Sequence, residues 1–364
     1  MKLLTALALA AATPVVFANT AFEERAPNAK FLIETAPGET RWVTEAEKWE
    51  LKKNDINFFD ITDQPQDFAI AQAPRVYAFP SAVKFQTEVK EIITKLSSTA
   101  MQTDLRQFSS YNNRYYQAQT GVTSANWLFD QVKAAVANIP GAKVEKVTHR
   151  FIQPSIRAII PGKGPKIIVV GAHEDSINSS QPQGRAPGAD DNGSGSITIL
   201  HGLRALAQDP KIAAGEALNT IEFHWYAGEE AGLLGSQDIF AQYRSQQKQV
   251  AAMLNQDMTG YGTAPMGIIT DNVDRSLTSF TRLVLAAYCT FRNVDSTCGY
   301  ACSDHASANR NGFPSAFVFE TAMSGSNPYI HTANDTIDRI NFNKVLDHAK
   351  LVVGFVYELA FSAL

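Results

Sequence analysis

The chain has 364 residues, of which 45% are hydrophobic and 19% carry a charge, a balance that suits a globular protein with a sizeable core. Its formal net charge is −4 at pH 7. Nucleic-acid-binding domains normally carry a basic surface, so this charge argues against a nucleic-acid partner.

The N-terminus has the pattern of a secretory signal peptide. Lys2 precedes an apolar run from Leu3 to Ala12, and the residues before Ala18 suit a cleavage site after it. The run is shorter than the roughly 20 residues that a membrane-spanning helix needs. We expect a signal peptide over residues 1–18, a secreted chain and no membrane partner. A buried N-terminal helix is the alternative.

Residues 19–77 differ in composition from the rest of the chain. A charged, amphipathic stretch containing Trp42 and Trp49 leads into a stretch rich in Gln, Pro and Ala, which is typical of an exposed linker suited to proteolysis. We predict a pro-segment over residues 19–77, removed near residues 74–80. The alternative is a small N-terminal subdomain that stays attached.

Short apolar runs alternate with helical patterns over the remaining residues. The runs typical of strands are 143–151, 156–162, 165–173, 219–230, 251–260, 267–272 and 315–320. The helical patterns are 196–208, 233–246, 277–288 and 342–364. Strands that alternate with helices predict a single α/β domain, in which a mostly parallel sheet is flanked by helices on both faces.

Three cysteines are present. In the oxidising surroundings of a secreted protein, two of them should form a disulfide. Cys298 and Cys302 lie four residues apart with a glycine between them, which permits a tight loop, so we expect this pair to bond. Cys289 lies in an apolar, helical pattern and is expected to be a buried free thiol. The spacing lacks a CxxC pattern, so a thiolate zinc site is not expected.

Histidine or acidic residues follow the ends of several predicted strands. His173 ends one apolar run, Glu229 and Glu230 follow a second, and Asp257 follows a third. In open α/β sheets, functional sites gather at the carboxyl ends of the strands, so we expect these side chains to converge. Each of them alone would be compatible with a solvated turn.

Two short motifs carry further carboxylates. In HED, Asp175 is placed to accept the second N–H of a metal-binding His173, which fixes the ring's tautomer. Asp190 and Asp191 precede a Gly- and Ser-rich stretch that opens a helix. A helix N-cap explains one of these acids but not both. A carboxylate between two cations would need small neighbours of this kind.

The adjacent Glu229 and Glu230 are expected to divide two tasks. On a loop, neighbouring side chains can point in different directions, so one can bind a metal while the other faces an attacking water. Two carboxylates held together repel each other unless cations offset their charge.

Together with Asp257 in NQDMTGY and His331 in IHTANDT, these motifs resemble the M28 family of co-catalytic zinc aminopeptidases. The segment CGYACSDHAS at 298–307 is similar to the family's secreted bacterial and fungal leucine aminopeptidase branch. The resemblance covers roughly residues 77–364, so the catalytic domain would span residues 78–364. Its fold would be that of the zinc exopeptidases, with a mostly parallel, mixed sheet.

The resemblance implies two Zn²⁺ ions per chain. Asp191, rather than its neighbour, would bridge the two ions, and the peptide bond after it would be cis. His173 and Asp257 would complete the first zinc site. Glu230 and His331 would complete the second.

The resemblance also implies the catalytic groups and the substrate. Glu229 would be the general base, and Tyr300 would hydrogen-bond the developing oxyanion. The substrates would be peptides and proteins with a free N-terminus, and the enzyme a monomer.

An apolar pocket for the first side chain of the substrate is expected next to the ligands. Its candidate lining residues are Met258, Phe319, Met323 and Ile330, for each of which an ordinary core position is the alternative. Such a pocket discriminates weakly between similar side chains, so we expect a preference for leucine with broad tolerance.

Three N-glycosylation sequons occur, at Asn178, Asn192 and Asn334. The last two lie beside expected ligands, where a sugar would block the site. Asn178 is therefore the favoured acceptor.

Three other functions fit parts of the pattern. A glutaminyl cyclase resembles this family in fold but uses one zinc, whereas all five ligands of a two-metal site are present here. A non-catalytic binding domain would be expected to lack ligands or the base. A carboxypeptidase would need a cationic group for the substrate's carboxylate, and the sequence does not place one.

Overall fold

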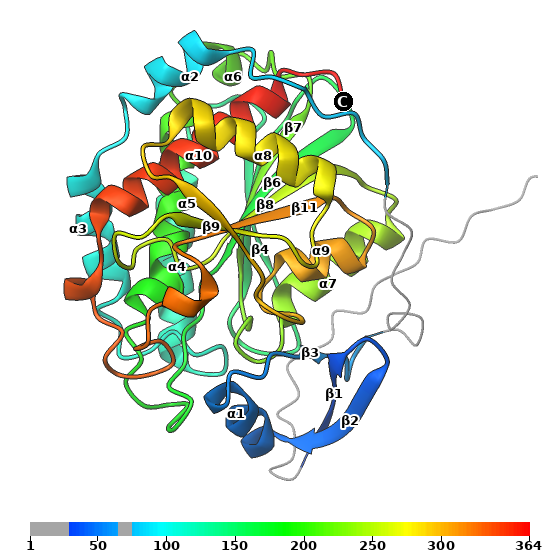
Figure 1. The fold of residues 1–364 in the computed structure, drawn as a ribbon, viewed down its shortest axis with the longest axis vertical. Coiled ribbons are helices and arrows are strands. Elements are labelled where there is room, and N and C mark those ends of the chain that lie inside the picture. Colours follow the sequence, from blue (N-terminus) through cyan, green and yellow to red (C-terminus); the bar gives the residue numbers. More distant parts are fainter. Residues whose placement is uncertain (1–28, 65–74) are drawn as a thin grey trace, which may run out of the picture.

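The computed structural model describes residues 29–64 and 75–364. The expected signal peptide, residues 1–18, lies outside these ranges. Residues 29–64, here called the N-terminal unit, form a small antiparallel sheet with one helix, drawn in blue at the bottom of Figure 1. Its elements are β1 (Lys30–Ala36), β2 (Glu39–Thr44), α1 (Glu45–Lys53) and β3 (Phe59–Asp60).

Residues 75–364, here called the main domain, are built on an eight-stranded sheet. The strands are β4 (Lys143–Val147), β5 (Ser155–Ile160), β6 (Lys166–His173), β7 (Thr220–Tyr226), β8 (Gln249–Gln256), β9 (Met266–Ile269), β10 (Asn293–Ser296) and β11 (Ser315–Phe319). Their order is β10-β9-β11-β8-β6-β7-β5-β4. The central strands β11, β8, β6 and β7 are parallel, and antiparallel pairs join β9 to β11, β5 to β7 and β4 to β5. The mixed, centrally parallel sheet confirms the predicted fold.

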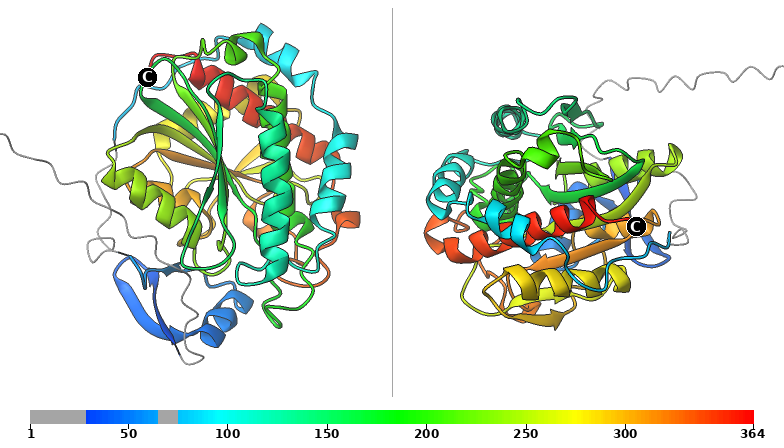
Figure 2. Two further views of the ribbon diagram at one scale, coloured as in Figure 1. Left: turned by 180° about the vertical axis from the view of Figure 1, so that it is seen from behind. Right: turned by 90° about the horizontal axis from the view of Figure 1, so that it is seen from above.

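Helices cover both faces of this sheet, as Figure 2 shows. They are α2 (Gln86–Ile93), α3 (Ser98–Phe108), α4 (Gln119–Ala135), α5 (Gly195–Leu206), α6 (Pro210–Ala213), α7 (Leu234–Ser245), α8 (Arg275–Tyr288), α9 (His305–Arg310) and α10 (Phe342–Ala360). Along β6, Ile168 and Val170 pack into the core shared with α5 and α10. Ile167 and Val169 point to the opposite face, where they pack with Phe240 of α7. This alternation places an apolar layer on each side of β6.

The predicted elements that surround the site are confirmed, but five helices and one strand of the main domain were missed. All seven predicted strands and all four predicted helices overlap an observed element. Helices α2, α3 and α4, between residues 86 and 135, are not among the predicted ones, and neither are the short helices α6 and α9 or the edge strand β10. Among the described residues, no helix combines the length and apolarity needed to cross a bilayer.

The N-terminal unit docks on the edge of the main domain where the central parallel strands end (Figure 1). The Asp60 N–H donates to the Gly232 carbonyl at 3.1 Å, and Gln237 Nε2 donates to the Asp60 carbonyl at 3.2 Å. Trp49 packs edge-on against Tyr115, with ring centroids 6.1 Å apart. The unit is therefore attached by backbone hydrogen bonds as well as by apolar contact.

A buried histidine in the core makes the fold sensitive to acid. His348 on α10 is fully buried, and its Nδ1 donates to Gln256 Oε1 at 2.9 Å. Burial lowers the pKa of His348 to about 3, with a smaller effect from the charge of Lys344. In the unfolded chain this residue binds a proton near pH 6.5. The unfolded state therefore holds more protons below that pH, and folding stability falls as the pH falls.

We expect His348→Gln to weaken the dependence of the unfolding free energy on pH between 6.5 and about 3. The wild-type chain should lose up to about 1.4 kcal/mol more per pH unit than the variant, the full effect of one proton. Denaturant unfolding of both proteins across this range, with a chelator present throughout, measures the difference. Parallel curves would show that His348 does not contribute to acid sensitivity.

Candidate active site

The predicted residues converge at the carboxyl ends of three neighbouring strands. His173 is the last residue of β6, Asp257 directly follows β8, and Glu229 and Glu230 lie on the loop after β7. A cavity of about 620 Å³ opens at this edge of the sheet, lined among others by Asp191, Glu229, Glu230, Asp257 and His331. The convergence expected from the strand ends is confirmed.

Asp191 lies between two histidines and faces each with a different oxygen. Its Oδ1 is 3.1 Å from His173 Nε2, and its Oδ2 is 3.1 Å from His331 Nε2. His173 Nε2 also lies 3.4 Å from Asp257 Oδ1. His331 Nε2 lies 3.1 Å from Glu230 Oε2. The five side chains thus form two groups that share Asp191, and in each group the possible ligand atoms lie within 4.8 Å of one another.

These residues fit a pair of zinc ions. Both carboxylate oxygens of Glu230 and Oδ1 of Asp257 are buried, and none of them receives a hydrogen bond of good geometry from a described residue. Buried carboxylate oxygens without such hydrogen bonds are costly, and coordination to a cation would satisfy them. Imidazole nitrogens and carboxylate oxygens are ligands that zinc accepts in catalytic sites. The donor set therefore suits two zinc ions bridged by Asp191.

The imidazoles and carboxylates of the two groups shift one another's pKa values toward the charged forms. Burial acts to lower the pKa of His331, but Glu230 and Asp191 outweigh it and raise the pKa to about 10. Burial acts to raise the pKa of Asp191, but hydrogen bonds with His173 and His331 hold it well below its usual range. The imidazoles and carboxylates are thus drawn together as opposite charges.

Asp175 supports both the histidine and the glutamate loop. Its Oδ1 lies 3.4 Å from His173 Nδ1, in contact but without hydrogen-bond geometry. Its two oxygens accept the backbone N–H groups of Glu229 at 3.0 Å and Glu230 at 3.2 Å. The predicted position behind His173 agrees with the structure, and the hydrogen bonds to the glutamate loop are an additional role.

Sequence reasoning missed Asp335, which holds the Asp190–Asp191 turn. Its carboxylate accepts the N–H of Asp190 at 3.0 Å and that of Asp191 at 2.9 Å. The Asp190 side chain is turned away from the histidines and accepts hydrogen bonds from Gly260 and Asn327. The turn therefore presents Asp191 and not Asp190 to the site, and the peptide bond after Asp191 is cis, as expected. The position of Asp335 four residues after His331 was the available signal.

A second missed residue enters the cavity from the N-terminal unit. Lys52, near the end of α1, places its Nζ 3.6 Å from Glu229 Oε2 and 3.4 Å from Glu230 Oε2. Burial acts to lower the pKa of Lys52, but these two carboxylates outweigh it, raise the pKa and keep the ammonium charged. No sequence signal distinguishes Lys52 from Lys53 beside it, because the difference depends on how the unit docks.

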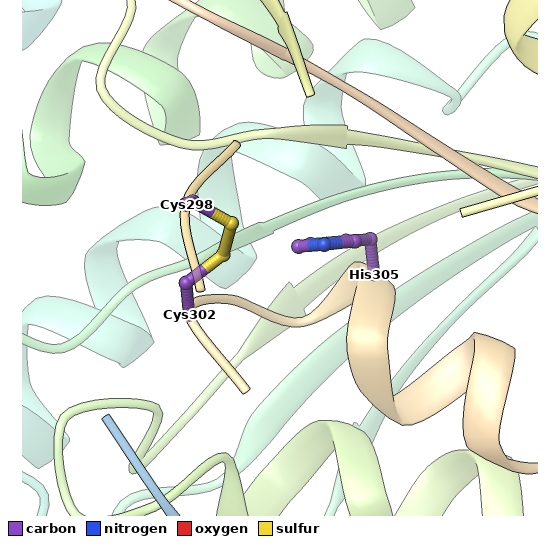
Figure 3. Close-up of side chains that lie close together, drawn as sticks. All are labelled: Cys298, Cys302 and His305. Carbon is purple, nitrogen blue, oxygen red and sulfur yellow. A yellow bond between two sulfur atoms is a disulfide. The ribbon is translucent and has the colours of Figure 1, made fainter. Parts of the chain in front are cut away.

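The four candidate pocket residues all line the cavity, namely Met258, Phe319, Met323 and Ile330. They belong to one apolar cluster, together with both half-cystines. The disulfide between Cys298 and Cys302 is formed, as predicted (Figure 3). Cys289 has no disulfide partner, but it is half-buried rather than buried, and its Sγ donates to the Asp347 carbonyl.

Tyr300 does not line the cavity in this structure. Its hydroxyl accepts a hydrogen bond from Arg310 Nη1 at 2.7 Å, and its ring packs edge-on against Phe59 of the N-terminal unit. Arg310 Nη2 in turn donates to Glu34 Oε2 of the same unit at 2.5 Å. The expected contact of Tyr300 with a reacting oxygen therefore stays a prediction.

The three sequons lie in different surroundings. Asn192 is fully buried and donates to the Gln256 carbonyl, which is incompatible with a sugar in the folded chain. Asn178 is half-buried and Asn334 is exposed. Glycosylation at Asn178 stays a prediction.

Comparison with known proteins identifies relatives along most of the chain. Residues 155–356, more than half of the chain, match the model of Peptidase family M28. A probable leucine aminopeptidase of Arthroderma benhamiae is 60% identical over 333 residues, which cover 92% of this chain and 93% of that protein. Leucine aminopeptidase 1 of Trichophyton equinum is 55% identical over 374 residues, which cover 99% of this chain and 100% of that protein.

Solved structures agree with this relationship. The LapA aminopeptidase of Legionella pneumophila is 29% identical, with a TM-score of 0.82 and coverage of 93% of this chain and 100% of that one. A glutaminyl cyclase of Porphyromonas gingivalis, 19% identical with a TM-score of 0.58 and coverage of 72% of this chain, is similar in fold alone. On the match to the family model and on these relatives, the chain belongs to peptidase family M28.

Proposed function

We propose that this protein is a secreted leucine aminopeptidase with two zinc ions bridged by Asp191. The observation that carries the proposal is the pair of side-chain groups that share this carboxylate, each with one histidine. The relatives named leucine aminopeptidase support the reaction and the preference for leucine. The apolar cavity wall next to the ligands suits a leucine side chain. The substrates are peptides and proteins with a free N-terminus.

In this proposal Glu229 is the general base. When bound, the zinc ions would polarise the scissile carbonyl and activate the attacking water. Glu229 lines the cavity beside Glu230 but belongs to neither ligand group, so once Lys52 has left with the N-terminal unit its carboxylate can accept the water's proton. Burial raises the pKa of Glu229, although Lys52 opposes the rise, and this favours proton uptake. Glu229 then passes the proton to the amine that leaves as the C–N bond breaks.

Residues 19–77 act in this proposal as an inhibitory pro-segment that is removed after residues 1–18 direct secretion. Lys52, Lys53, Asp55 and Asn57 all line the cavity, so the N-terminal unit occupies space that a substrate would need. The ammonium of Lys52 also neutralises part of the charge of Glu229 and Glu230.

The N-terminal unit also contacts Tyr300, the residue that we propose as the hydrogen-bond donor to the oxyanion. The Phe59 ring packs against Tyr300, with ring centroids 5.5 Å apart, and also beneath the Arg310 guanidinium at 4.8 Å. Glu34 accepts a hydrogen bond from Arg310, which in turn donates to the Tyr300 hydroxyl. Removal of the unit would leave Tyr300 without two of the residues that fix its position.

The rival enzyme is a one-zinc glutaminyl cyclase, because proteins of that class share the fold. The two activities differ in metal content and in product. A binding domain without catalysis and a carboxypeptidase would both fail to release amino acids from aminoacyl anilides.

The processed chain should bind two zinc ions and release leucine from a leucyl anilide. Chelation should abolish turnover, and added zinc should restore it, because the donor set fits two cations bridged by one carboxylate. Elemental analysis and anilide hydrolysis, with an N-terminal glutaminyl peptide as the competing substrate, measure both properties. One zinc per chain together with cyclisation and no leucine release would contradict the proposal.

Glu229→Gln should remove turnover while both zinc ions stay bound, since the amide keeps the shape of the side chain but cannot take a proton. Loss of a general base typically costs about 10²–10⁴-fold in rate. Steady-state kinetics and metal analysis on the same preparation separate the two effects. Retained activity would exclude Glu229 as the base, and lost zinc would make it a ligand.

Lys52→Met should raise the activity of the unprocessed chain, because the N-terminal unit then loses its ion pairs with Glu229 and Glu230. A rise of about tenfold corresponds to roughly 1.4 kcal/mol of weaker docking. Lys53→Met is the matched control, since Lys53 is next to Lys52 but pairs with Glu50 on the same helix. Equal activity of both variants before processing would exclude an inhibitory role for Lys52.

A further inference from the structure

A second cluster of possible metal ligands lies beside the cavity, separate from the two groups that share Asp191. It consists of Cys298, Cys302 and His305, whose sulfur and ring nitrogen atoms lie within 4.8 Å of one another. His305 is the first residue of α9, and its ring points toward the disulfide (Figure 3). The proposed function uses this disulfide as part of the pocket wall but gives His305 no role.

The His305 imidazole is buried without a well-formed hydrogen bond. Its exposed fraction is 0%, and neither ring nitrogen makes a hydrogen bond of good geometry to any described residue. One side of the ring packs against Phe317, with ring centroids 4.8 Å apart. Burial lowers the pKa of His305 to about 3, against a smaller opposing effect of a weak hydrogen bond with the Asp271 backbone. The ring is therefore neutral at ordinary pH, which is the form that ligates metals.

A buried polar group without a good hydrogen bond is costly, so the position of this ring calls for an explanation. The disulfide sulfurs beside it are weak acceptors and offer it no strong hydrogen bond. If the loop adopted a second state in which both sulfurs are thiolates, one ring nitrogen of His305 could bind the same cation as the two sulfurs.

The loop that carries the two cysteines is held at both ends without help from the disulfide. The Asp271 carboxylate accepts the N–H groups of Cys298 at 3.0 Å and Gly299 at 2.9 Å. After the second cysteine, Ser303 Oγ donates to Asp257 Oδ2 at 2.6 Å. Opening the sulfur–sulfur bond would therefore leave both sulfurs close to His305.

We propose that reduction of the Cys298–Cys302 disulfide creates a third metal site, which binds one thiophilic divalent cation through two thiolates and the His305 imidazole. Two thiolates neutralise the charge of a divalent ion, and a Cys₂His set with one open position is known for catalytic zinc. Because both cysteines line the cavity, the open position would face it.

Reduction of the disulfide and binding of the cation require nothing from the proposed catalytic zinc ions. A reductant, either a dithiol or a phosphine, supplies two electrons and the sulfur–sulfur bond breaks. Two protons complete the thiols. The dithiol becomes its own disulfide, or the phosphine takes an oxygen atom from water and becomes its oxide. The incoming cation then displaces the two thiol protons to solvent.

Spacing alone does not predict this site. The pattern is C-x₃-C-x₂-H. It lacks a CxxC pair, and for that reason the sequence alone argued against a thiolate site. The start of α9 brings His305 back toward the loop, so the third ligand comes from the fold.

Cobalt(II) is the probe that tests this site in the full chain. Sulfur-to-cobalt charge-transfer absorption requires a thiolate ligand, so cobalt bound by the imidazoles and carboxylates of the Asp191 site does not contribute. We expect the absorption to appear when metal-free protein is reduced with a phosphine under anaerobic conditions. The oxidised protein should lack it and should bind one cobalt ion fewer.

Four variants assign the absorption to its ligands. Cys289→Ser, the matched control, removes the remaining thiol and should keep the absorption. The double variant Cys298→Ser/Cys302→Ser should lose it, and Cys302→Ser alone should weaken it. His305→Asn should lower cobalt affinity by at least about tenfold, a loss seen even for outer partners of metal ligands.

Three outcomes would overturn the proposal: no charge-transfer absorption after reduction, absorption that persists without Cys298 and Cys302, or unchanged cobalt affinity in His305→Asn. If His305→Asn does not fold, as judged by circular dichroism, the affinity of Cys302→Ser decides in its place. These measurements do not use peptide hydrolysis, so the proposed aminopeptidase activity could fail while this site is supported, or the reverse.

Discussion

The arrangement of the site depends on one buried carboxylate that must use both of its oxygens. Asp191 lies 3.1 Å from a histidine nitrogen on each side, and the two histidines come from distant parts of the chain. If the carboxylate turned toward His173, it would leave His331, and the reverse holds as well. The position of Asp191 therefore sets the distance between the end of β6 and the loop that carries His331.

Hydrogen bonds outside the two ligand groups also hold Asp191 in that position. Asp335 accepts two consecutive backbone N–H groups of the turn, and Asn192 donates to the Gln256 carbonyl at the end of β8. The Met258 N–H donates back to Asn192 Oδ1 at 3.1 Å. These hydrogen bonds attach the turn to the end of β8 and to the loop that carries His331. A carboxylate that is costly to bury is thus held by groups that are themselves fully satisfied.

The sequence was sufficient for the parts of the site that follow from strand ends. Apolar runs that stop at His173, Glu229 and Asp257 located three loops of the candidate site, because parallel strands end at one edge of a sheet. Helices α2 to α4 were missed, although α3 has apolar residues at helical spacing. They lie apart from the sequence motifs that located the other elements. Lys52 and the environment of Tyr300 could not be predicted, because both depend on contact between segments far apart in the chain. Asp335 was missed because its carboxylate binds backbone groups, and its position four residues after His331 was the one signal in the sequence.

The acidity of the cavity explains why a lysine of the N-terminal unit enters it. Carboxylates that are buried close together repel one another and gain from any cation that enters, whether a metal ion or an ammonium group. The Lys52 ammonium lies within 3.6 Å of Glu229 and Glu230, and it is chemically the same group as the N-terminal amine of a peptide. In the proposed function, a free N-terminus is thus drawn by the same charges that hold the pro-segment. Removal of the N-terminal unit would then exchange one ammonium group for another at the same carboxylates.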